Sequence, residues 1–182
     1  MFLVTYTAYC TNCHAPLLLL RISVSIVTFT GPIYAIMANR AVQVNPQNEV
    51  VLSADDQGAT AFMLVKCRAW NFVSEVLRSR CFSLVAANTD AWYVRHRRFL
   101  LCVEPKPDSD LHLYDLDSSF IVHKDTFYDF NHGYYSLESV NFPNYYVQSL
   151  DDGRLGITQR ADTAAYSRTA SFENSAYSTS GN

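Results

Sequence analysis

The chain has 182 residues with a formal net charge of −3, and 49% of its residues are hydrophobic, 14% aromatic and 17% charged. This length supports one domain with a substantial core, and the small charge excludes the strong field that recruits nucleic acid or anionic membranes. An apolar composition with few charges and many Val, Ile, Tyr, Phe and Thr residues favours strands.

The first 21 residues are interpreted as an N-terminal extension of uncertain role. They contain the string Cys10-Thr-Asn-Cys13-His14, which has the C-x-x-C-H spacing of c-type haem attachment. The string is short enough to arise by chance, and the further ligands that a metal ion needs do not accompany it. We therefore expect no cofactor and no metal ion.

An apolar stretch over residues 15–37 carries Arg21 as its one charge and is long enough for a membrane span. However, Ile22-Ser23-Val24-Ser25-Ile26 alternates apolar and small polar residues, which is the period of a strand, and Gly31-Pro32 ends the run like a turn. No Lys or Arg precedes the stretch and no clear small-x-small cleavage site follows it, so no signal peptide is evident. The pattern predicts a strand here, and we do not expect the chain to bind a membrane.

Three successive segments repeat one pattern of short strands and turns, and Tyr34, Tyr93 and Tyr146 hold the same place in them. The segments run over about 22–80, 81–133 and 134–175. Four strands in each segment predict an all-β domain, a β-trefoil of three four-stranded repeats, in which six strands close a barrel and three hairpins cap it. Closure removes the exposed strand edges that otherwise template aggregation.

The remaining features concern the cysteines and the C-terminus. Residues 176–182 are small and polar, and we expect this tail to fray. The odd number and irregular spacing of the cysteines do not indicate a disulfide framework, although a single bridge remains open. The cysteines are Cys10, Cys13, Cys67, Cys81 and Cys102.

Strings in the second and third segments carry a resemblance to a known family. They are Trp92-Tyr93-Val94-Arg95-His96, Tyr114-Asp115-Leu116-Asp117 and Ser136-Leu137-Glu138-Ser139-Val140-Asn141. These strings resemble the arabinofuranose-binding domain of fungal and bacterial α-L-arabinofuranosidases, the family 42 carbohydrate-binding modules. The resemblance covers roughly residues 27–174 and is weakest in the first segment. It implies the same β-trefoil fold and favours an extracellular location.

The resemblance also implies a shallow pocket for a terminal arabinofuranose, with polar contacts from His96 and Asp117. A carboxylate accepts charge-assisted hydrogen bonds from sugar hydroxyls, and a neutral imidazole offers one donor and one acceptor. The ring of Tyr93 can cover the apolar face of the sugar. In the first segment the corresponding strings have neither the histidine nor the aspartate, and in the third segment the two positions are Ser149 and Thr169. We therefore expect one retained pocket, in the second segment.

A basic cluster, formed by Arg95, Arg97 and Arg98, surrounds His96. Such a cluster can meet a phosphate or a sulfated sugar, but it more often lies on a solvated strand face beside acidic residues. The expected acidic partners are Asp108, Asp110 and Asp115.

The leading hypothesis is a non-catalytic, lectin-like module whose partner is a glycan with terminal arabinofuranose or a similar sugar. The alternative is a degenerate domain that has lost its sugar sites and acts as a structural module or binds another protein. We do not expect an enzyme, because nucleophile elbows, P-loops and dinucleotide fingerprints are absent from the sequence. Nothing in the sequence brings two carboxylates together across a cleft, as glycoside hydrolysis requires.

Overall fold

The computed structural model describes residues 30–35, 40–53, 59–87, 92–124 and 134–174, together with Thr89 and Phe127. The predicted extension over 1–21, the haem-like string within it, the predicted strand over 22–26 and the tail over 176–182 lie outside these ranges. No helix among the described residues is long and apolar enough to cross a membrane.

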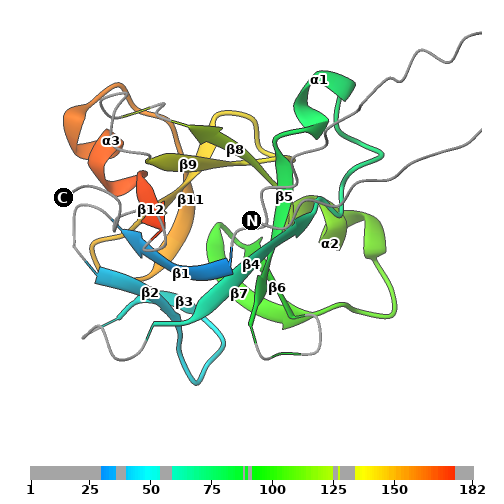
Figure 1. Cartoon of the computed structure of the whole chain (residues 1–182), viewed down its shortest axis with the longest axis horizontal. Coiled ribbons are helices and arrows are strands. Elements are labelled where there is room, and N and C mark those ends of the chain that lie inside the picture. The colour runs from blue at the N-terminus through cyan, green and yellow to red at the C-terminus, as the bar shows by residue number, and fades with distance from the viewer. Residues whose placement is uncertain are drawn as a thin grey trace, which may run out of the picture.

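The described part of the chain consists of short strands and three helices of one or two turns (Figure 1). The strands are β1 (Thr30–Ala35), β2 (Arg40–Val44), β3 (Val50–Leu52), β4 (Ala61–Lys66), β5 (Cys81–Ala86), β6 (Trp92–Arg97), β7 (Leu100–Pro105), β8 (Phe120–Lys124), β9 (Tyr135–Ser139), β10 (Tyr145–Ser149), β11 (Leu155–Gln159) and β12 (Phe172–Asn174). The helices are α1 (Glu75–Arg78), α2 (Leu111–Asp117) and α3 (Ala164–Thr169).

The strands close into an antiparallel barrel. A ring of pairings runs through seven strands in the order β5, β6, β7, β11, β10, β9 and β8, and β8 pairs with β5 again. A second row of pairings leads from β9 through β12, β1 and β4 to β5. Closure pairs the backbone groups that an open sheet would leave at its edges.

The prediction of a β-trefoil of three four-stranded repeats is therefore wrong: the chain is all-β, but it forms a closed seven-stranded antiparallel barrel. The prediction treated each hairpin as a separate cap, whereas β7 and β11 pair directly through Leu100 and Gly156. A Cβ atom at Gly156 would lie 2.7 Å from the carbonyl oxygen of Phe99. Because glycine has none, the amide of Ile157 donates a 2.8 Å hydrogen bond to that oxygen.

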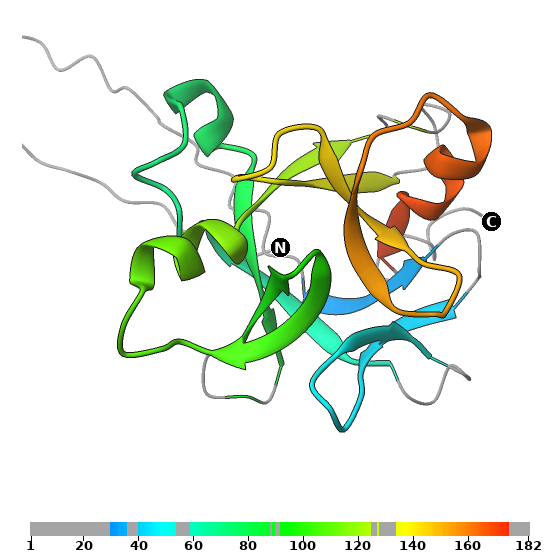
Figure 2. The same ribbon diagram turned by 180° about the vertical axis from the view of Figure 1, so that it is seen from behind.

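The three tyrosines also differ in their place along the strands. Tyr34 lies in β1, where it pairs with Ala41 and Glu173, whereas Tyr93 and Tyr146 lie in β6 and β10, each the first strand of a hairpin. The prediction that Tyr34 holds the same place as Tyr93 and Tyr146 is therefore wrong, because it lies one strand earlier in its segment. Seen from behind, the hairpins β2–β3, β6–β7 and β10–β11 surround one end of the barrel (Figure 2).

A continuous apolar core fills the barrel because strand residues alternate between its two faces. Its largest fully buried members are Phe62, Phe120, Phe172 and Ile157. A cavity of about 20 Å³ inside this core is lined only by apolar side chains, and such small apolar cavities stay dry. The cavity therefore does not provide a ligand site.

A smaller apolar cluster surrounds a disulfide bond between Cys67 and Cys81. This is the single bridge that the cysteine count left open. The bridge joins the residue after β4 to the first residue of β5, and it closes the segment that contains α1. Cys102 has a free, half-buried thiol whose pKa is raised to about 11, first by burial and then by Glu104.

Candidate functional site

The structure brings two of the three predicted site residues together. His96 lies in β6 and Asp117 is the last residue of α2, and the imidazole Nε2 is 3.5 Å from the carboxylate Oδ1. Both residues are buried, with exposed fractions of 3% for His96 and 5% for Asp117. The pair lies where the β6–β7 hairpin meets α2.

Strand alternation places the side chains of β6 on two different faces. Val94 and His96 face the barrel interior, and Val94 is part of the core. Tyr93 and Arg95 project from the other face of the strand. Tyr93 therefore does not lie over His96, and its ring instead meets the ring of Tyr114 edge-on at 6.4 Å.

Short-range hydrogen bonds hold α2 in place against the hairpin. The hydroxyl of Tyr114 donates to the carbonyl of Glu104 at 2.7 Å, which ties the helix to β7. The hydroxyls of Ser118 and Ser119 donate to the carbonyls of Tyr114 and Asp115 in the last turn. Asp117 is thereby positioned at the helix end, where its carboxylate turns towards β6.

The carboxylate of Asp117 is the centre of a charged network. Its Oδ2 accepts a 2.7 Å hydrogen bond from Nη2 of Arg95, and its Oδ1 accepts one of 2.7 Å from Nδ2 of Asn141. The Arg95 guanidinium lies 5.1 Å from the centre of the Tyr114 ring and also contacts Glu104 at 3.4 Å. Burial raises the pKa of Tyr114 to about 12, so its hydroxyl stays a donor.

His96 is held as a neutral imidazole. Its Nε2 is 2.8 Å from Oδ1 of Asn141 and 3.1 Å from the hydroxyl of Ser139. Because the Asn141 amide nitrogen donates to Asp117, its oxygen is the acceptor, and the proton of His96 lies on Nε2. Burial lowers the pKa of His96, a shift that the hydrogen bond to Asn141 and the charge of Asp117 oppose and the charge of Arg95 assists.

One donor of this network has no protein partner. The Nε–H of Arg95 is buried and finds no acceptor among the described residues, although the two terminal nitrogens of the guanidinium are both paired. A buried donor without a partner is rare in native proteins. The network can therefore still form one more hydrogen bond.

Several members of the network were not predicted from the sequence. Ser139 is the last residue of β9 and Asn141 lies two residues after the strand. Both reach the pair from a part of the chain that is distant in sequence from His96 and Asp117. The string Ser139-Val140-Asn141 is part of the family resemblance, but only the hydrogen bonds of Ser139 and Asn141 to the pair show that it completes this cluster.

The basic cluster has other partners than expected. Arg95 pairs with Asp117 and Glu104, and Arg97 pairs with Glu104 at 2.7 Å. Asp115 pairs instead with Arg68 at 2.5 Å. The predicted pairing of this cluster with Asp108, Asp110 and Asp115 is therefore not seen in the described ion pairs.

A similar arrangement without charges lies beside α3. The amide nitrogen of Gln148 donates to the hydroxyl of Thr169 at 2.6 Å, and the hydroxyl of Ser149 is 3.4 Å from the Thr169 carbonyl. The hydroxyl of Tyr166 donates to the carbonyl of Thr158 at 2.9 Å, as Tyr114 does to Glu104 beside α2. Where the cluster beside α2 has the charged pair of Arg95 and Asp117, the cluster beside α3 has the neutral residues Gln148 and Thr169. Neutral hydrogen bonds therefore take the place of an ionic network.

The part of the chain that the structure describes contains no group of three or more His, Cys, Asp or Glu residues placed to hold a metal ion. The functional candidates are thus hydrogen-bonding and charged side chains.

The fold and this network define the chain as a small all-β domain with an ionic cluster between a hairpin and a helix end. Residues 43–174 match the model of the Alpha-L-arabinofuranosidase B (ABFB) domain, and the chain belongs to that family. No curated protein matches the sequence.

Solved structures with the same fold include larger enzymes. An arabinofuranosidase complexed with arabinofuranosyl-alpha-1,2-xylobiose is 20% identical, with a TM-score of 0.58, and the match covers 79% of this chain and 30% of that one. A GH54 α-L-arabinofuranosidase soaked with a cyclic sulfate inhibitor is 19% identical, with a TM-score of 0.59, over 80% and 30% of the two chains. A GlcNAcα1-4Gal-releasing endo-β-galactosidase from Clostridium perfringens is 10% identical, with a TM-score of 0.55, over 81% and 32%. The chain thus spans about 30% of the length of these arabinofuranosidases.

Proposed function

We propose that the chain is a non-catalytic carbohydrate-binding module for arabinofuranose-containing or related glycans, with Asp117 and His96 in its binding site. The observation that carries the proposal is the 3.5 Å approach of the Asp117 carboxylate to the His96 imidazole in one network, within a member of the ABFB domain family. The match is confined to this domain and to about 30% of the related enzymes, which supports a non-catalytic role.

The chemistry of the network suits a sugar hydroxyl. The ionised carboxylate of Asp117 accepts strong hydrogen bonds, and the unpaired Nε–H of Arg95 can donate to a hydroxyl oxygen. Because both His96 and Asp117 are buried, a hydroxyl reaches them by replacing one of the present protein hydrogen bonds. Asn141, the uncharged donor to Oδ1, is the partner to be displaced, since displacing Arg95 would break a buried ion pair.

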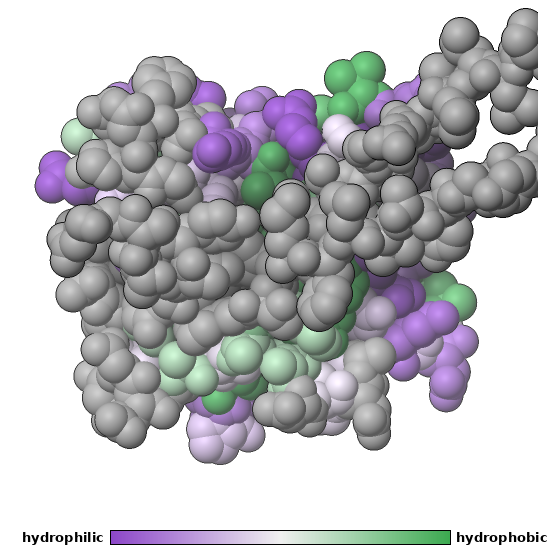
Figure 3. All heavy atoms as spheres, in the orientation of Figure 1, coloured by the Kyte–Doolittle hydropathy of each residue, from purple (hydrophilic) through white to green (hydrophobic). Residues whose placement is uncertain are grey.

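A second candidate is a structural role for the network in a module that binds another protein. Its specific support is that both carboxylate oxygens of Asp117 already have protein partners. Hydrophobic residues are also exposed on α1, on α2 and before α1, and Figure 3 shows such surface among hydrophilic residues at the α1 end. These residues are Phe72, Val76, Leu111 and Leu113.

The test is binding of the full chain to arabinan and to arabinofuranosyl oligosaccharides, measured by calorimetry and affinity electrophoresis. The wild type is compared with Asp117→Asn, which keeps the shape of the side chain but removes its charge. Thr169→Val is the matched control, because Thr169 occupies the similar position beside α3. Circular dichroism establishes that each variant is folded before binding is measured.

The proposal expects binding by the wild type and by Thr169→Val, and a loss of at least about tenfold in affinity for Asp117→Asn, since a charge-assisted hydrogen bond is worth roughly 1.5–3 kcal/mol. If the folded wild type binds none of these glycans, the lectin function is rejected. Equal affinity of Asp117→Asn and the wild type would show that the binding site lies elsewhere on the domain.

A further inference from the structure

The segment closed by the disulfide lies directly against the helix that carries Asp117. Cys67 and Cys81 are buried, and they pack with Val73 of the closed segment and with Ile121 of β8. Leu116, the neighbour of Asp117 in α2, packs against the same cluster. The bridge therefore belongs to the surroundings of the candidate site.

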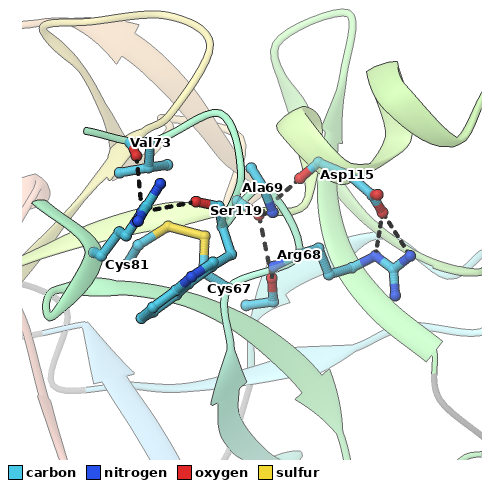
Figure 4. The surroundings of a disulfide bond; sticks show 10 residues. Cys67, Arg68, Ala69, Val73, Cys81, Asp115 and Ser119 are labelled. Atoms are coloured by element: carbon cyan, nitrogen blue, oxygen red, sulfur yellow. Dashed lines mark hydrogen bonds and ion pairs between the residues drawn. A yellow bond between two sulfur atoms is a disulfide. The ribbon is translucent and has the colours of Figure 1, made fainter. Parts of the chain in front are cut away.

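The two residues after Cys67 bind α2 by several independent contacts. The Arg68 guanidinium forms an ion pair with Asp115 at 2.5 Å and lies over the rings of Tyr93 and Tyr114, at 4.6 and 5.3 Å from their centres. The amide of Ala69 donates to the hydroxyl of Ser119 at 3.0 Å. Figure 4 shows Arg68 pointing towards Asp115 and Ala69 lying beside Ser119, next to the disulfide.

The helix itself provides little that would fix its position. α2 has seven residues, its N-cap residue Asp110 has a φ of 55°, and no side chain caps its first turn. Isolated helices of this length are unstable in water. The position of Asp117 therefore depends on contacts from outside the helix.

The helix α3 provides a comparison within the same molecule. Its N-cap residue Thr163 accepts a 3.1 Å hydrogen bond from the amide of Tyr166. Phe127, an uncharged residue, contacts Tyr146 and Tyr166 there, in the way that Arg68 contacts Tyr93 and Tyr114 beside α2. A tyrosine hydroxyl ties each helix to a hairpin. In addition, α3 has a cap of its own, whereas α2 has the contacts from the disulfide-closed segment.

We propose that the Cys67–Cys81 disulfide, acting through Arg68 and Ala69, positions α2 and thereby Asp117. The bridge restricts the segment over residues 67–81, which keeps Arg68 on Asp115 and the Ala69 amide on Ser119. Without the bridge these contacts open more often, and the end of α2 moves relative to β6. The consequence for glycan affinity rests on the proposed function, whereas the positioning of α2 does not.

The test is amide hydrogen exchange of the full chain under native conditions. Two amides form a matched pair: that of Ser118 bonds to the Tyr114 carbonyl at 3.0 Å in α2, and that of Ala170 bonds to the Tyr166 carbonyl at 2.9 Å in α3. In the variant Cys67→Ala/Cys81→Ala we expect exchange at Ser118 to accelerate at least about tenfold, while that at Ala170 changes less than about twofold. Thr163→Ala, which removes the cap of α3, is expected to accelerate exchange at Ala170 and to leave exchange at Ser118 nearly unchanged.

Arg68→Met serves as a second variant because it keeps the bridge and removes the ion pair with Asp115. It is expected to accelerate hydrogen exchange at Ser118 and not at Ala170. Arg97→Met, which changes an exposed arginine, is expected to accelerate exchange at neither amide. Equal acceleration of exchange at both amides, or at neither, in the cysteine variant would overturn the proposal.

Where the wild type binds arabinan, the affinity for arabinan is expected to be lower in the cysteine variant. A wild type that binds no glycan rejects the proposed function alone and leaves the exchange result valid.

Discussion

At the scale of single residues, the ion pair of Arg95 with Asp117 is buried and is therefore costly to break. The two side chains are 14% and 8% exposed and their charged atoms are 2.7 Å apart. Removing one partner of such a pair leaves a buried charge without compensation, which costs about 3–5 kcal/mol. The same residues that suit a sugar site are therefore also important for stability.

This argument predicts that Asp117→Asn lowers the free energy of unfolding by about 3 kcal/mol, measured by urea denaturation at neutral pH. The matched control is Arg97→Ala, since Arg97 forms its ion pair with Glu104 while 66% exposed. Exposed pairs are worth less than about 1 kcal/mol. Equal losses for the two variants would show that the Arg95–Asp117 pair is not a buried charge pair in solution.

His96 gives the domain a dependence on pH. Burial lowers its pKa in the folded state, while the unfolded chain binds the proton near the ordinary value of about 6.5. The unfolded state therefore binds more protons than the folded state below that pH. The contribution of neutral His96 to the free energy of unfolding is complete above about pH 6.5 and is lost as the pH falls.

We expect the free energy of unfolding to decrease from pH 7 to pH 5, with a slope of at most about 1.4 kcal/mol per pH unit from this residue. His96→Gln is expected to remove that part of the slope, and His112→Gln, at an exposed position of α2, is the control. Denaturation curves at half-unit intervals of pH measure the difference. An unchanged slope in His96→Gln would contradict the assignment.

At the scale of elements, the joint between the hairpins β6–β7 and β10–β11 depends on Gly156. Replacing it by alanine places a Cβ 2.7 Å from a backbone oxygen, which no side-chain rearrangement can relieve. We predict that Gly156→Ala costs about 2 kcal/mol or more in unfolding free energy. Gly153→Ala, where φ is 81° and nothing lies within 4 Å, is expected to cost about 1 kcal/mol through backbone strain alone. A smaller loss at Gly156 than at Gly153 would show that the close approach is absent.

The same joint shows what could be predicted from the sequence. Alternating residues such as those around Val94 and Val147 predict strands because each face of a strand has one environment, and both residues lie in strands, β6 and β10. The pairing of Leu100 with Gly156 depends on a close approach between backbones, which leaves no hydrophobic pattern. The family resemblance predicted His96 and Asp117 as site residues, but Asn141 joins them from the turn between β9 and β10, and no local rule connects the three.

At the scale of the whole molecule, the two helix ends differ in charge, and this bears on how many glycans one chain binds. Beside α2 the partners are Arg95 and Asp117, whereas beside α3 they are Gln148 and Thr169. Neutral hydrogen bonds are about half as strong as charge-assisted ones, so only the first cluster offers a strong acceptor for sugar hydroxyls.

We therefore predict one glycan per chain, measured by calorimetry with a short arabinofuranosyl oligosaccharide and the monomeric fraction of the protein. Because one chain then has one site, its affinity per sugar terminus should be the same for this oligosaccharide and for branched arabinan. Two linked sites would instead raise the affinity for the branched polymer by roughly 10²–10⁴-fold. A stoichiometry of two, or such a gain with Thr169→Val abolishing it, would show that the neutral cluster beside α3 binds sugar as well.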